Sequence, residues 1–377
     1  MNFSIIQPGR ILFGRGTATQ TPALACGLGP RGLVVHGAST DRAGWLLTAL
    51  NALGAEVMAL PCAAEPDLAA LQAALDVARP HAPDWVVGIG GGAAIDLAKA
   101  VAALLPAPGT PLDHLEVVGR GLPLIAPPLP LIALPTTAGT GAEVTRNAVI
   151  GLPEHGRKVS LRDERMIARV AIVDPALTDG CPRPVTLASG MDALAQVIEP
   201  WVSCRATPYT DALTAGAAGP GLAALVRLMQ GEDAAARDAM AWCSLSGGLA
   251  LANGGLGAVH GLAGVIGGMT GAPHGVICGT LLGPVLAMNR DRTQGAVRAR
   301  IEDTCAAIAG VLGGSIIEAP HTLAEWARGA GLPSLRTMGL NPADHRKTAE
   351  AALTASSTKG NPVVLSAAEL ESVLALG

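Results

Sequence analysis

The sequence predicts an N-terminal α/β domain built on a parallel sheet, followed by an all-helical domain. In the first half, short apolar runs alternate with stretches of helical periodicity, as in a parallel sheet covered by helices on both faces. Beyond Pro182-Arg183-Pro184 the periodicity is mainly helical, and no clear strand interrupts it. Because paired prolines often mark a boundary, we expect domains at residues 1–183 and 184–377.

The expected strands are short and strongly apolar. The run Trp85-Val86-Val87-Gly88-Ile89-Gly90 carries no charge, as expected for a strand buried on both faces. The proline-rich residues 104–130 are expected to form a long loop. Strands are predicted at residues 32–37, 56–60, 85–90, 131–135 and 170–174, with helices at 45–53 and 67–78.

The second half shows helical periodicity over several long stretches, and we find no internal repeat. A proline inside one of these stretches, Pro220, is expected to break the helix near it. Helices are predicted at residues 193–199, 210–229, 233–251, 298–312 and 323–329.

Composition excludes several classes of protein. With 50% hydrophobic residues the chain is not disordered, and a net charge of −4 argues against a nucleic-acid binder with a broad basic surface. The most apolar stretch, Val117–Leu134, is crossed by Arg120 and four prolines, so no membrane span is expected. The seven cysteines form no CxxC pair, and the first residues lack a signal-peptide pattern. We therefore expect a cytoplasmic protein with reduced thiols.

A triple glycine follows the apolar strand at Trp85–Gly90. Gly90, Gly91 and Gly92 precede Ala93, where a helix is expected to begin. Glycines let the backbone approach a phosphate closely, and a helix N-terminus offers free N–H groups to it. The pattern predicts a phosphate-binding turn, although it is not the GxGxxG of a standard dinucleotide fold. The alternative is an ordinary tight strand-to-helix turn.

A second loop is rich in hydroxyl groups. Pro135–Thr145 follows an expected strand and interleaves Thr136, Thr137, Thr140 and Thr145 with two glycines. Such a loop can offer hydroxyls and N–H groups to a ribose and a phosphate. A loop whose threonines only cap local structure is the competing interpretation.

Asp and His residues of the second half form a candidate metal site. Asp192 and Gln196 are four residues apart and so share one helix face, and His260 and His274 come later in the chain. The glycines between the two histidines predict a break in the helix there. Carboxylate and imidazole groups from separate segments can hold a divalent metal, but a lone histidine is more often a packed or solvent-facing residue.

Together these segments resemble the iron-containing (group III) alcohol dehydrogenase family, over essentially the whole chain and in the same order. The family elements GGGSxxDxAK, PTTAGTGSEVT, DPxLT and GMDAL, and its two His segments, resemble Gly90–Lys99, Pro135–Thr145, Asp174–Thr178, Gly190–Leu194, Val259–Ala263 and Pro273–Gly275. Phe13-Gly14 and Asn361-Pro362 also fit. The resemblance implies the dehydroquinate-synthase-like superfold, an α/β dinucleotide-binding domain followed by a helical domain.

The resemblance also implies an activity, a cofactor and a site. It implies an NAD(P)-dependent alcohol dehydrogenase or aldehyde reductase that acts on a small alcohol or aldehyde, with the nicotinamide between the two domains and hydride transfer assisted by Fe²⁺ or Zn²⁺. A homodimer or larger assembly is implied too. Asp192, His260 and His274 would be catalytic and, with Gln196, would bind the metal. The cofactor would contact Gly37, Ser39, Gly90, Gly91, Gly92, Ala93, Asp96, Thr136, Thr137, Thr140 and Lys158.

The sequence departs from the family pattern in the expected metal site. Gln196 stands where the family has a third histidine, and an amide oxygen is a weaker ligand than imidazole for iron or zinc. Gly264 stands where family members often carry a histidine thought to relay protons. Neither departure touches the residues expected to bind the cofactor. A metal-free pocket in which Gln196 forms hydrogen bonds is the alternative.

Two further features concern specificity. After the strand at residues 32–37, NAD-preferring members carry an Asp, whereas this chain has His36-Gly37-Ala38-Ser39. Since Ser39 can donate to a 2′-phosphate, NADPH is favoured over NADH. If Arg146, Arg157 and Lys158 face the substrate, an anionic substrate is indicated. A solvated face or contacts to cofactor phosphates is the other interpretation of these cations.

Three functions compete with the alcohol dehydrogenase or aldehyde reductase hypothesis. A maleylacetate-reductase-like oxidoreductase would share the architecture and need no metal. A lyase similar to the dehydroquinate-synthase branch is disfavoured by the match at Pro135–Thr145 and Gly190–Leu194. A protein that binds a dinucleotide but has a degraded metal site would bind cofactor without turnover.

Overall fold

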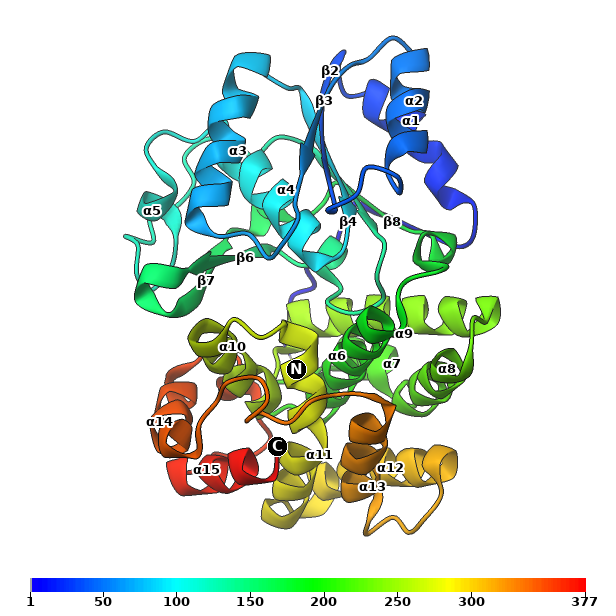
Figure 1. The fold of residues 1–377 in the computed structure, drawn as a ribbon, viewed down its shortest axis with the longest axis vertical. Coiled ribbons are helices and arrows are strands. Elements are labelled where there is room, and N and C mark those ends of the chain that lie inside the picture. Colours follow the sequence, from blue (N-terminus) through cyan, green and yellow to red (C-terminus); the bar gives the residue numbers. More distant parts are fainter. Residues whose placement is uncertain (1) are drawn as a thin grey trace. The chain divides into compact units, whose positions relative to one another are not determined.

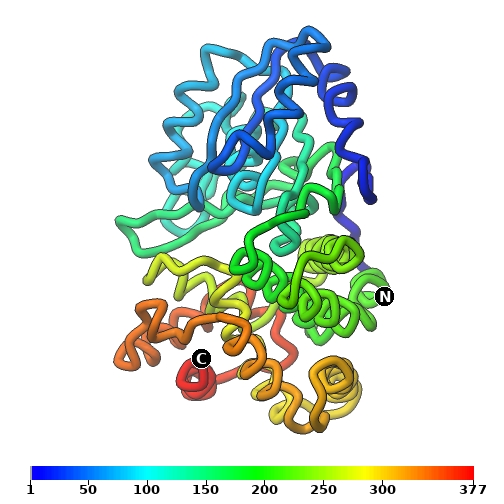
Figure 2. Tube along the Cα trace, turned by 45° about the vertical axis from the view of Figure 1, so that its right-hand side comes forward, coloured from blue at the N-terminus to red at the C-terminus, as the bar shows by residue number. Residues whose placement is uncertain are grey.

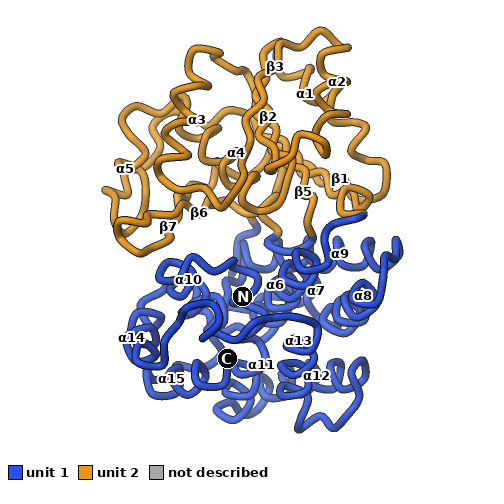
Figure 3. The backbone as a smooth tube through the Cα atoms, viewed as in Figure 1, with its two compact units in different colours: residues 1–5, 138–140, 180–377 blue, residues 6–137, 141–179 orange. Residues whose placement is uncertain are grey.

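The computed structural model describes residues 2–377, which divide into two compact units (Figure 3). The sheet unit comprises Ile6–Thr137 and Gly141–Asp179. The helical unit comprises Gly180–Gly377 together with Ala138–Thr140 and the N-terminal residues up to Ile5. The chain therefore leaves the sheet unit shortly after its last strand and does not return to it.

A six-stranded parallel sheet forms the centre of the sheet unit (Figure 1). Its strand order is β1-β8-β5-β4-β2-β3. Every adjacent pair is parallel, which confirms the predicted sheet. The strands are β1 (Arg10–Phe13), β2 (Arg31–His36), β3 (Glu56–Pro61), β4 (Trp85–Gly90), β5 (Leu131–Pro135) and β8 (Val170–Val173).

Helices cover both faces of this sheet, because alternate residues of each strand are apolar on opposite sides. In β2, for example, Leu33 and Val35 belong to one apolar cluster and Val34 to the other. The first cluster includes residues of α3 (Leu68–His81) and α4 (Gly92–Leu104). The second includes residues of α1 (Thr21–Cys26) and α2 (Gly44–Ala52).

An antiparallel hairpin, which the sequence analysis did not predict, lies between β5 and β8 in the chain. It pairs β6 (Asn147–Leu152) with β7 (Arg157–Arg162). The inward residues Ala148, Ile150, Val159 and Leu161 join the same cluster as α3 and α4. The expected long loop at residues 104–130 contains one short helix, α5 (Pro111–His114).

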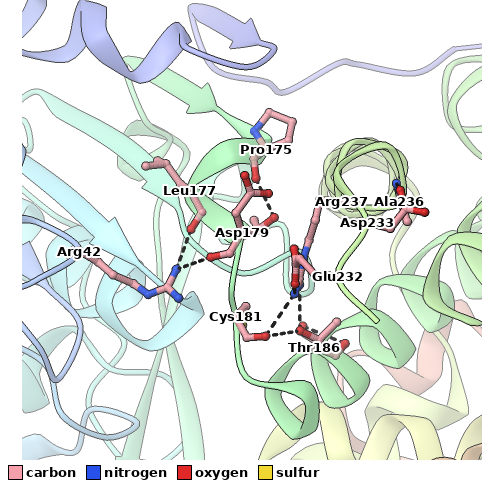
Figure 4. A network of polar contacts seen from close by, with 12 residues as sticks. Arg42, Pro175, Leu177, Asp179, Cys181, Thr186, Glu232, Asp233, Ala236 and Arg237 are labelled. Carbon is pink, nitrogen blue, oxygen red and sulfur yellow. Dashed lines mark hydrogen bonds and ion pairs between the residues drawn. The ribbon is translucent and has the colours of Figure 1, made fainter. Parts of the chain in front are cut away.

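The segment that resembles DPxLT has a clear structural role. Asp174 is buried and accepts hydrogen bonds from the N–H groups of Ala18, at 3.0 Å, and Ala176, at 3.0 Å. In the same unit Arg42 donates to the carbonyl oxygens of Leu177, at 3.0 Å, and Asp179, at 3.4 Å (Figure 4). These contacts fix the last part of the sheet unit before the chain enters the helical unit.

The helical unit contains ten α-helices among its described residues and no strand, as predicted (Figure 2, green to red). Its single large core is rich in Leu, Ile, Val and Ala. The helices are α6 (Arg183–Val202), α7 (Pro208–Thr214), α8 (Ala218–Gln230), α9 (Ala234–Gly254), α10 (Ala258–Thr270), α11 (His274–Arg292), α12 (Gly295–Leu312), α13 (Ala319–Ala330), α14 (His345–Thr354) and α15 (Ala367–Leu376).

Helix α6 is held at its start by a buried arginine. Arg237 donates to the hydroxyl of Thr186, at 2.8 Å, and to the carbonyl oxygen of Cys181, at 3.2 Å (Figure 4). Its charge is balanced by Glu232, at 2.7 Å. This cluster orients α6, which carries Asp192, Gln196 and Glu199.

The predicted break near Pro220 lies a few residues earlier. Helix α7 ends at Thr214 and α8 begins at Ala218, so Pro220 lies in the first turn of α8, where a proline is tolerated. By length and hydropathy the combined segment Pro208–Gln230 could cross a membrane, and the bent pair α9–α10 passes the same test. Core helices of soluble proteins also pass it, so the test supports a membrane protein only weakly.

Candidate active site

A cluster of polar side chains is buried where α6, α10 and α11 of the helical unit pack together. Helix α6 supplies Asp192, Gln196 and Glu199, which lie on one face because they are four and three residues apart. Helix α10 supplies His260, and the first turn of α11 supplies His274. The glycine-containing link between α10 and α11 forms the break expected between the two histidines.

The side chains of this cluster converge on a small volume. The Nε2 atom of His260 lies 3.3 Å from Oδ1 of Asp192, and Nε2 of His274 lies 3.8 Å from the same oxygen. The two imidazole rings are 5.2 Å apart between centroids. On the other side of the carboxylate, Nε2 of Gln196 donates to Oδ2 of Asp192 at 3.3 Å. The structure thus brings together all four predicted metal ligands.

Three buried atoms in this cluster have no hydrogen-bond partner among the described residues. They are Oδ1 of Asp192, Oε1 of Gln196 and Nε2 of His260; the first and the last lie 3.3 Å apart, which is an ion-pair contact only when the histidine is protonated. A buried polar atom without a partner costs about 1–3 kcal/mol, so three in one place require an explanation. Two of these atoms are oxygens and the third is an imidazole nitrogen, which are ligands of divalent cations. The donor set therefore fits a metal ion.

Negative charge dominates the cluster and shifts the pKa values within it. Burial alone would lower the pKa of His274, but Cys278 and Asp192 outweigh it and raise that pKa to about 9. Burial likewise opposes ionisation of Asp192, yet His274 and His260 hold the pKa of its carboxyl below the ordinary value. The site stabilises positive charge, which a divalent cation supplies.

Two residues of the cluster were missed by the sequence analysis. Glu199 accepts from Nδ1 of His260 at 2.6 Å and from the N–H of Val259 at 2.7 Å. It therefore fixes the imidazole with Nε2 directed at Asp192, the arrangement common behind metal-bound histidines. Cys278 lies one turn after His274, with its sulfur 3.5 Å from Nε2 of that histidine. The sequence did contain a signal for both residues, because helical spacing places each on the same face as a predicted ligand. Glu199 is seven residues after Asp192, and Cys278 is four residues after His274.

Space for a side chain is present at Gly264, where family members often carry the histidine thought to relay protons. Gly264 lies on α10 one turn after His260, and a Cβ built on it would meet no heavy atom within 4 Å. A side chain would therefore fit there, so steric crowding does not explain the glycine.

In the sheet unit, the structure gathers several predicted cofactor-binding residues at one edge of the sheet. Strands β2, β4 and β5 are adjacent and parallel, so Gly37, Gly90 and Thr136, at or just beyond their carboxyl ends, lie close together. The N–H of Thr136 donates to the carbonyl of Gly90 at 2.9 Å. Ligands of open α/β sheets bind at this edge. Gly91 caps α4 without any side-chain hydrogen bond, so the first N–H groups, from Gly92 and Ala93, face a free helix end.

Gly90 has no room for a side chain, because neighbouring atoms of Ala94 and Gly37 lie too close to it. A Cβ at this position would lie 2.6 Å from Cβ of Ala94 and 3.3 Å from the backbone nitrogen of Gly37. We expect Gly90→Ala to lower the free energy of unfolding by about 1–3 kcal/mol, since overpacking forces the backbone to shift. Thermal and urea unfolding would measure it. Gly44→Ala is the matched control, because a Cβ there meets nothing within 4 Å. An equal effect of both changes would contradict the prediction.

The threonine-rich loop is divided between the units. Thr136 and Thr137 belong to the sheet unit, with Oγ1 of Thr137 3.5 Å from a Cβ built on Gly91, whereas Thr140 belongs to the helical unit. After Thr140 the chain turns at Gly141, whose φ of 57° suits glycine. Further along, Lys99 of α4 donates to Oγ1 of Thr145 at 2.9 Å and to the carbonyl of Asn147.

Several residues predicted to contact the cofactor or substrate already have partners. Asp96 accepts from the N–H of Val149 at 3.0 Å and lies 3.2 Å from Nζ of Lys99. Lys158 pairs with Glu65. Arg146 pairs with Glu164 at 2.9 Å, and the Ser39 hydroxyl accepts from the N–H of Asp41 at 3.1 Å. The roles of these residues in binding stay predictions.

A buried carboxyl next to this loop gives the sheet unit a pH dependence. Glu143 is 2% exposed, and burial raises the pKa of its carboxyl to about 7 although Lys99 opposes the shift. Because the folded chain holds this proton to higher pH than the unfolded chain does, stability falls as the pH rises from about 4.5 to 7. We expect Glu143→Gln to match the wild type at pH 4.5. Above pH 7 it should be more stable by about 3 kcal/mol, at 1.36 kcal/mol per pKa unit. Urea unfolding at several pH values measures it, and a constant difference across that range would contradict it.

Comparison with known families identifies the chain. The model of the iron-containing alcohol dehydrogenase family matches residues 8–175. The model of the C-terminal part of Fe-containing alcohol dehydrogenases matches residues 186–376. Apart from Ala138–Thr140, the first match lies within the sheet unit, and the second lies within the helical unit; together they span nearly the whole chain.

Individual relatives agree with this. The chain is 34% identical over 307 residues to lactaldehyde reductase of Escherichia coli K12, covering 79% of this chain and 78% of that one. It is 36% identical over 247 residues to the probable alcohol dehydrogenase EutG of the same organism, covering 65% of this chain and 62% of EutG. The match thus spans about six tenths of the length of EutG.

Solved structures have the same fold over the whole chain. A 1,3-propanediol oxidoreductase is 28% identical with a TM-score of 0.86, covering 100% of this chain and 99% of that one. An alcohol dehydrogenase from Oenococcus oeni is 25% identical with a TM-score of 0.88, covering 99% of each chain. The family matches, the relatives and the fold agree with the resemblance seen in the sequence: the chain belongs to the iron-containing alcohol dehydrogenase family.

Proposed function

We propose that the chain is a nicotinamide-dependent alcohol dehydrogenase or aldehyde reductase that uses a divalent metal. The observation that carries the proposal is the group of orphaned buried atoms of Asp192, Gln196 and His260, in a family whose members are alcohol dehydrogenases. When bound, the cation polarises the oxygen of the alcohol or aldehyde, while the nicotinamide exchanges a hydride with its carbon.

The protein's own groups would prepare this chemistry. Asp192, His260 and His274 would hold the cation, and Glu199, by accepting from Nδ1 of His260, would leave the lone pair of Nε2 for the metal. Gln196 holds the carboxylate of Asp192 through Oδ2. The side chain of His274 is 33% exposed, which leaves one side of the cluster open to a substrate.

The edge of the sheet near Gly37, Gly90 and Thr136 would bind the dinucleotide. The uncapped start of α4 offers N–H groups and the positive end of the helix dipole to the pyrophosphate. We favour NADPH, because no acidic residue immediately follows β2 and Ser39 carries a hydroxyl that can donate. The ratio of kcat/KM for NADPH and NADH tests this choice, and a ratio below one would reverse it.

A short, uncharged aldehyde or alcohol is the favoured substrate class. Relatives named for lactaldehyde and 1,3-propanediol act on small oxygenated molecules. An anionic substrate loses support, because Arg146 and Lys158 pair with Glu164 and Glu65. A homodimer or larger assembly and a cytoplasmic location stay predictions.

The test combines metal content with turnover. Protein purified without chelator or affinity metal is analysed by elemental mass spectrometry, and oxidation of NADPH and NADH is followed with a panel of short aldehydes. About one equivalent of metal per chain, with turnover lost after chelation and restored by metal, would support the proposal. Cofactor binding without turnover of any aldehyde or alcohol would overturn it.

A metal-independent reductase is the second candidate, favoured by a glutamine where the family has histidine. Gln196→His distinguishes the two. If the metal assists catalysis, we expect tighter metal binding by roughly tenfold or more, on the scale of changes around a metal site, and higher kcat/KM. If no metal is used, kcat/KM stays unchanged. Metal titration and steady-state kinetics on the same preparation give both readouts.

A further inference from the structure

Cys278 faces the same point as the predicted metal ligands. It is fully buried on α11, one turn after His274, and its sulfur lies 3.5 Å from Nε2 of that histidine. One ligand atom from each of Asp192, His260, His274 and Cys278 lies within 4.8 Å of all the others. Neither the spacing of motifs nor the family resemblance had singled out this cysteine.

The separations of these atoms match the edges of a tetrahedron around a metal. Bonds of about 2.0–2.3 Å from zinc to oxygen, nitrogen and sulfur give tetrahedral edges of roughly 3.3–3.8 Å. The structure has 3.3 Å between Asp192 and His260, 3.8 Å between Asp192 and His274, and 3.5 Å between His274 and Cys278. Three edges of the cluster therefore already have the size that a bound cation requires.

Gln196 is arranged differently from a ligand. Its amide nitrogen, which cannot bind a cation, donates to Oδ2 of Asp192 at 3.3 Å. This contact leaves Oδ1 of Asp192 facing the two histidines. The amide oxygen of Gln196 has no partner among residues 2–377, so this oxygen is the competing candidate for the fourth ligand.

We propose that Cys278 is a thiolate ligand of the divalent metal, together with Asp192, His260 and His274, and that Gln196 positions Asp192 instead. The inference rests on the metal site of the proposed function. On binding, the S–H bond of Cys278 breaks, a metal–sulfur bond forms and the proton passes to solvent, with no change of oxidation state. Because thiolate is a soft ligand, this set favours Zn²⁺ over Fe²⁺.

Cobalt substitution tests the proposal without relying on activity. The purified full-length chain is stripped of metal and titrated with Co²⁺, and the absorption spectrum is recorded. We expect a thiolate-to-cobalt charge-transfer band in the wild type. The band should be absent from Cys278→Ser and retained in Gln196→Ala. Cys305→Ala is the matched control, since Cys305 is equally buried but lies on α12, outside the cluster.

Competition with a chromophoric chelator measures the affinity of each variant for Zn²⁺. Cys278→Ala should weaken Zn²⁺ binding by more than the roughly 10–100-fold typical of an outer-shell change, and Gln196→Ala should stay within that range. The reverse order of the two variants would overturn the proposal and make Gln196 the ligand. Circular dichroism confirms that each variant is folded.

The outcomes separate this inference from the proposed function. Co²⁺ bound to the wild type without a charge-transfer band would overturn the thiolate ligand and leave metal-assisted catalysis standing. No binding of Co²⁺ or Zn²⁺ at all would overturn both.

Discussion

His260→Ala is expected to abolish metal binding and to reduce kcat/KM by about a thousandfold or more. The change removes one ligand and leaves Glu199, which is 4% exposed, without the imidazole that it contacts at 2.6 Å. Polarisation of the substrate oxygen by a metal is worth several kcal/mol, and each 1.36 kcal/mol corresponds to a factor of ten in rate. Metal content and aldehyde-dependent oxidation of NAD(P)H on one preparation would measure both losses.

Two further variants give this prediction its controls. His321→Ala removes an exposed histidine that pairs with Glu325 at 3.2 Å on α13, so metal content and rate should not change. Glu199→Gln keeps a side chain of the same size beside His260 and should weaken metal binding by roughly 10–100-fold, less than the loss of a ligand. An unchanged metal content in His260→Ala would exclude this histidine from the metal site.

The sheet could be predicted from the sequence because its central strands are buried on both faces. Trp85–Gly90 and Leu131–Pro135 are the bounds both of the predicted strands and of β4 and β5. A strand that packs on both faces must be apolar at every position, which leaves a strong signal. Strands β6 and β7 alternate buried with partly exposed residues, and β7 carries Arg157, Lys158 and Arg162. Their signal is therefore weaker, and it was missed.

In the helical unit, too, some elements leave only a weak signal in the sequence. Helices α10 and α11 are rich in glycine, which is unfavourable in helices, so their periodicity is faint although the structure continues them for 13 and 19 residues. Tertiary packing allows these glycines. A Cβ at Gly275 would lie 2.5 Å from the carbonyl oxygen of Ala188, and one at Gly279 would lie 2.8 Å from Cβ of Met191. Close contact between α6 and α11, which no local pattern reveals, sets these positions.

The candidate site was predictable only where a motif marked it. Asp192, His260 and His274 stand in segments that resemble family elements, and the structure brings them together. Glu199 and Cys278 carry no motif, and a single cysteine or glutamate on an apolar helix is usually structural. Only the packing of three helices shows that their side chains converge. The departure at Gln196 could be seen from the sequence, but not the cysteine that faces the same cluster.

Lys99→Met is expected to lower the free energy of unfolding by about 3–5 kcal/mol, because it leaves a buried carboxylate without its partner. Nζ of Lys99 lies 3.2 Å from Oδ1 of Asp96, and Lys99 is 1% exposed. Burial raises the pKa of Asp96 despite the attraction of Lys99, and burial lowers the pKa of Lys99 despite Asp96. Desolvation therefore outweighs the attraction, so the pair is costly to bury and still more costly to break. Urea unfolding measures the loss.

The double variant Lys99→Met with Asp96→Asn should recover part of this loss, because the substituted amide is neutral and its oxygen can still accept from the N–H of Val149. An exposed pair supplies the comparison: Arg79 lies 3.4 Å from Asp76, and Arg79→Met should cost less than about 1 kcal/mol. Lys99 also donates to Thr145, the last residue of the threonine-rich loop, and to Asn147 just beyond it. Lys99→Met should therefore also raise KM for the cofactor. A loss as small as that of Arg79→Met would mean that Asp96 is neutral or hydrated in the folded chain, and the Asp96–Lys99 pair within α4 would then contribute little to stability.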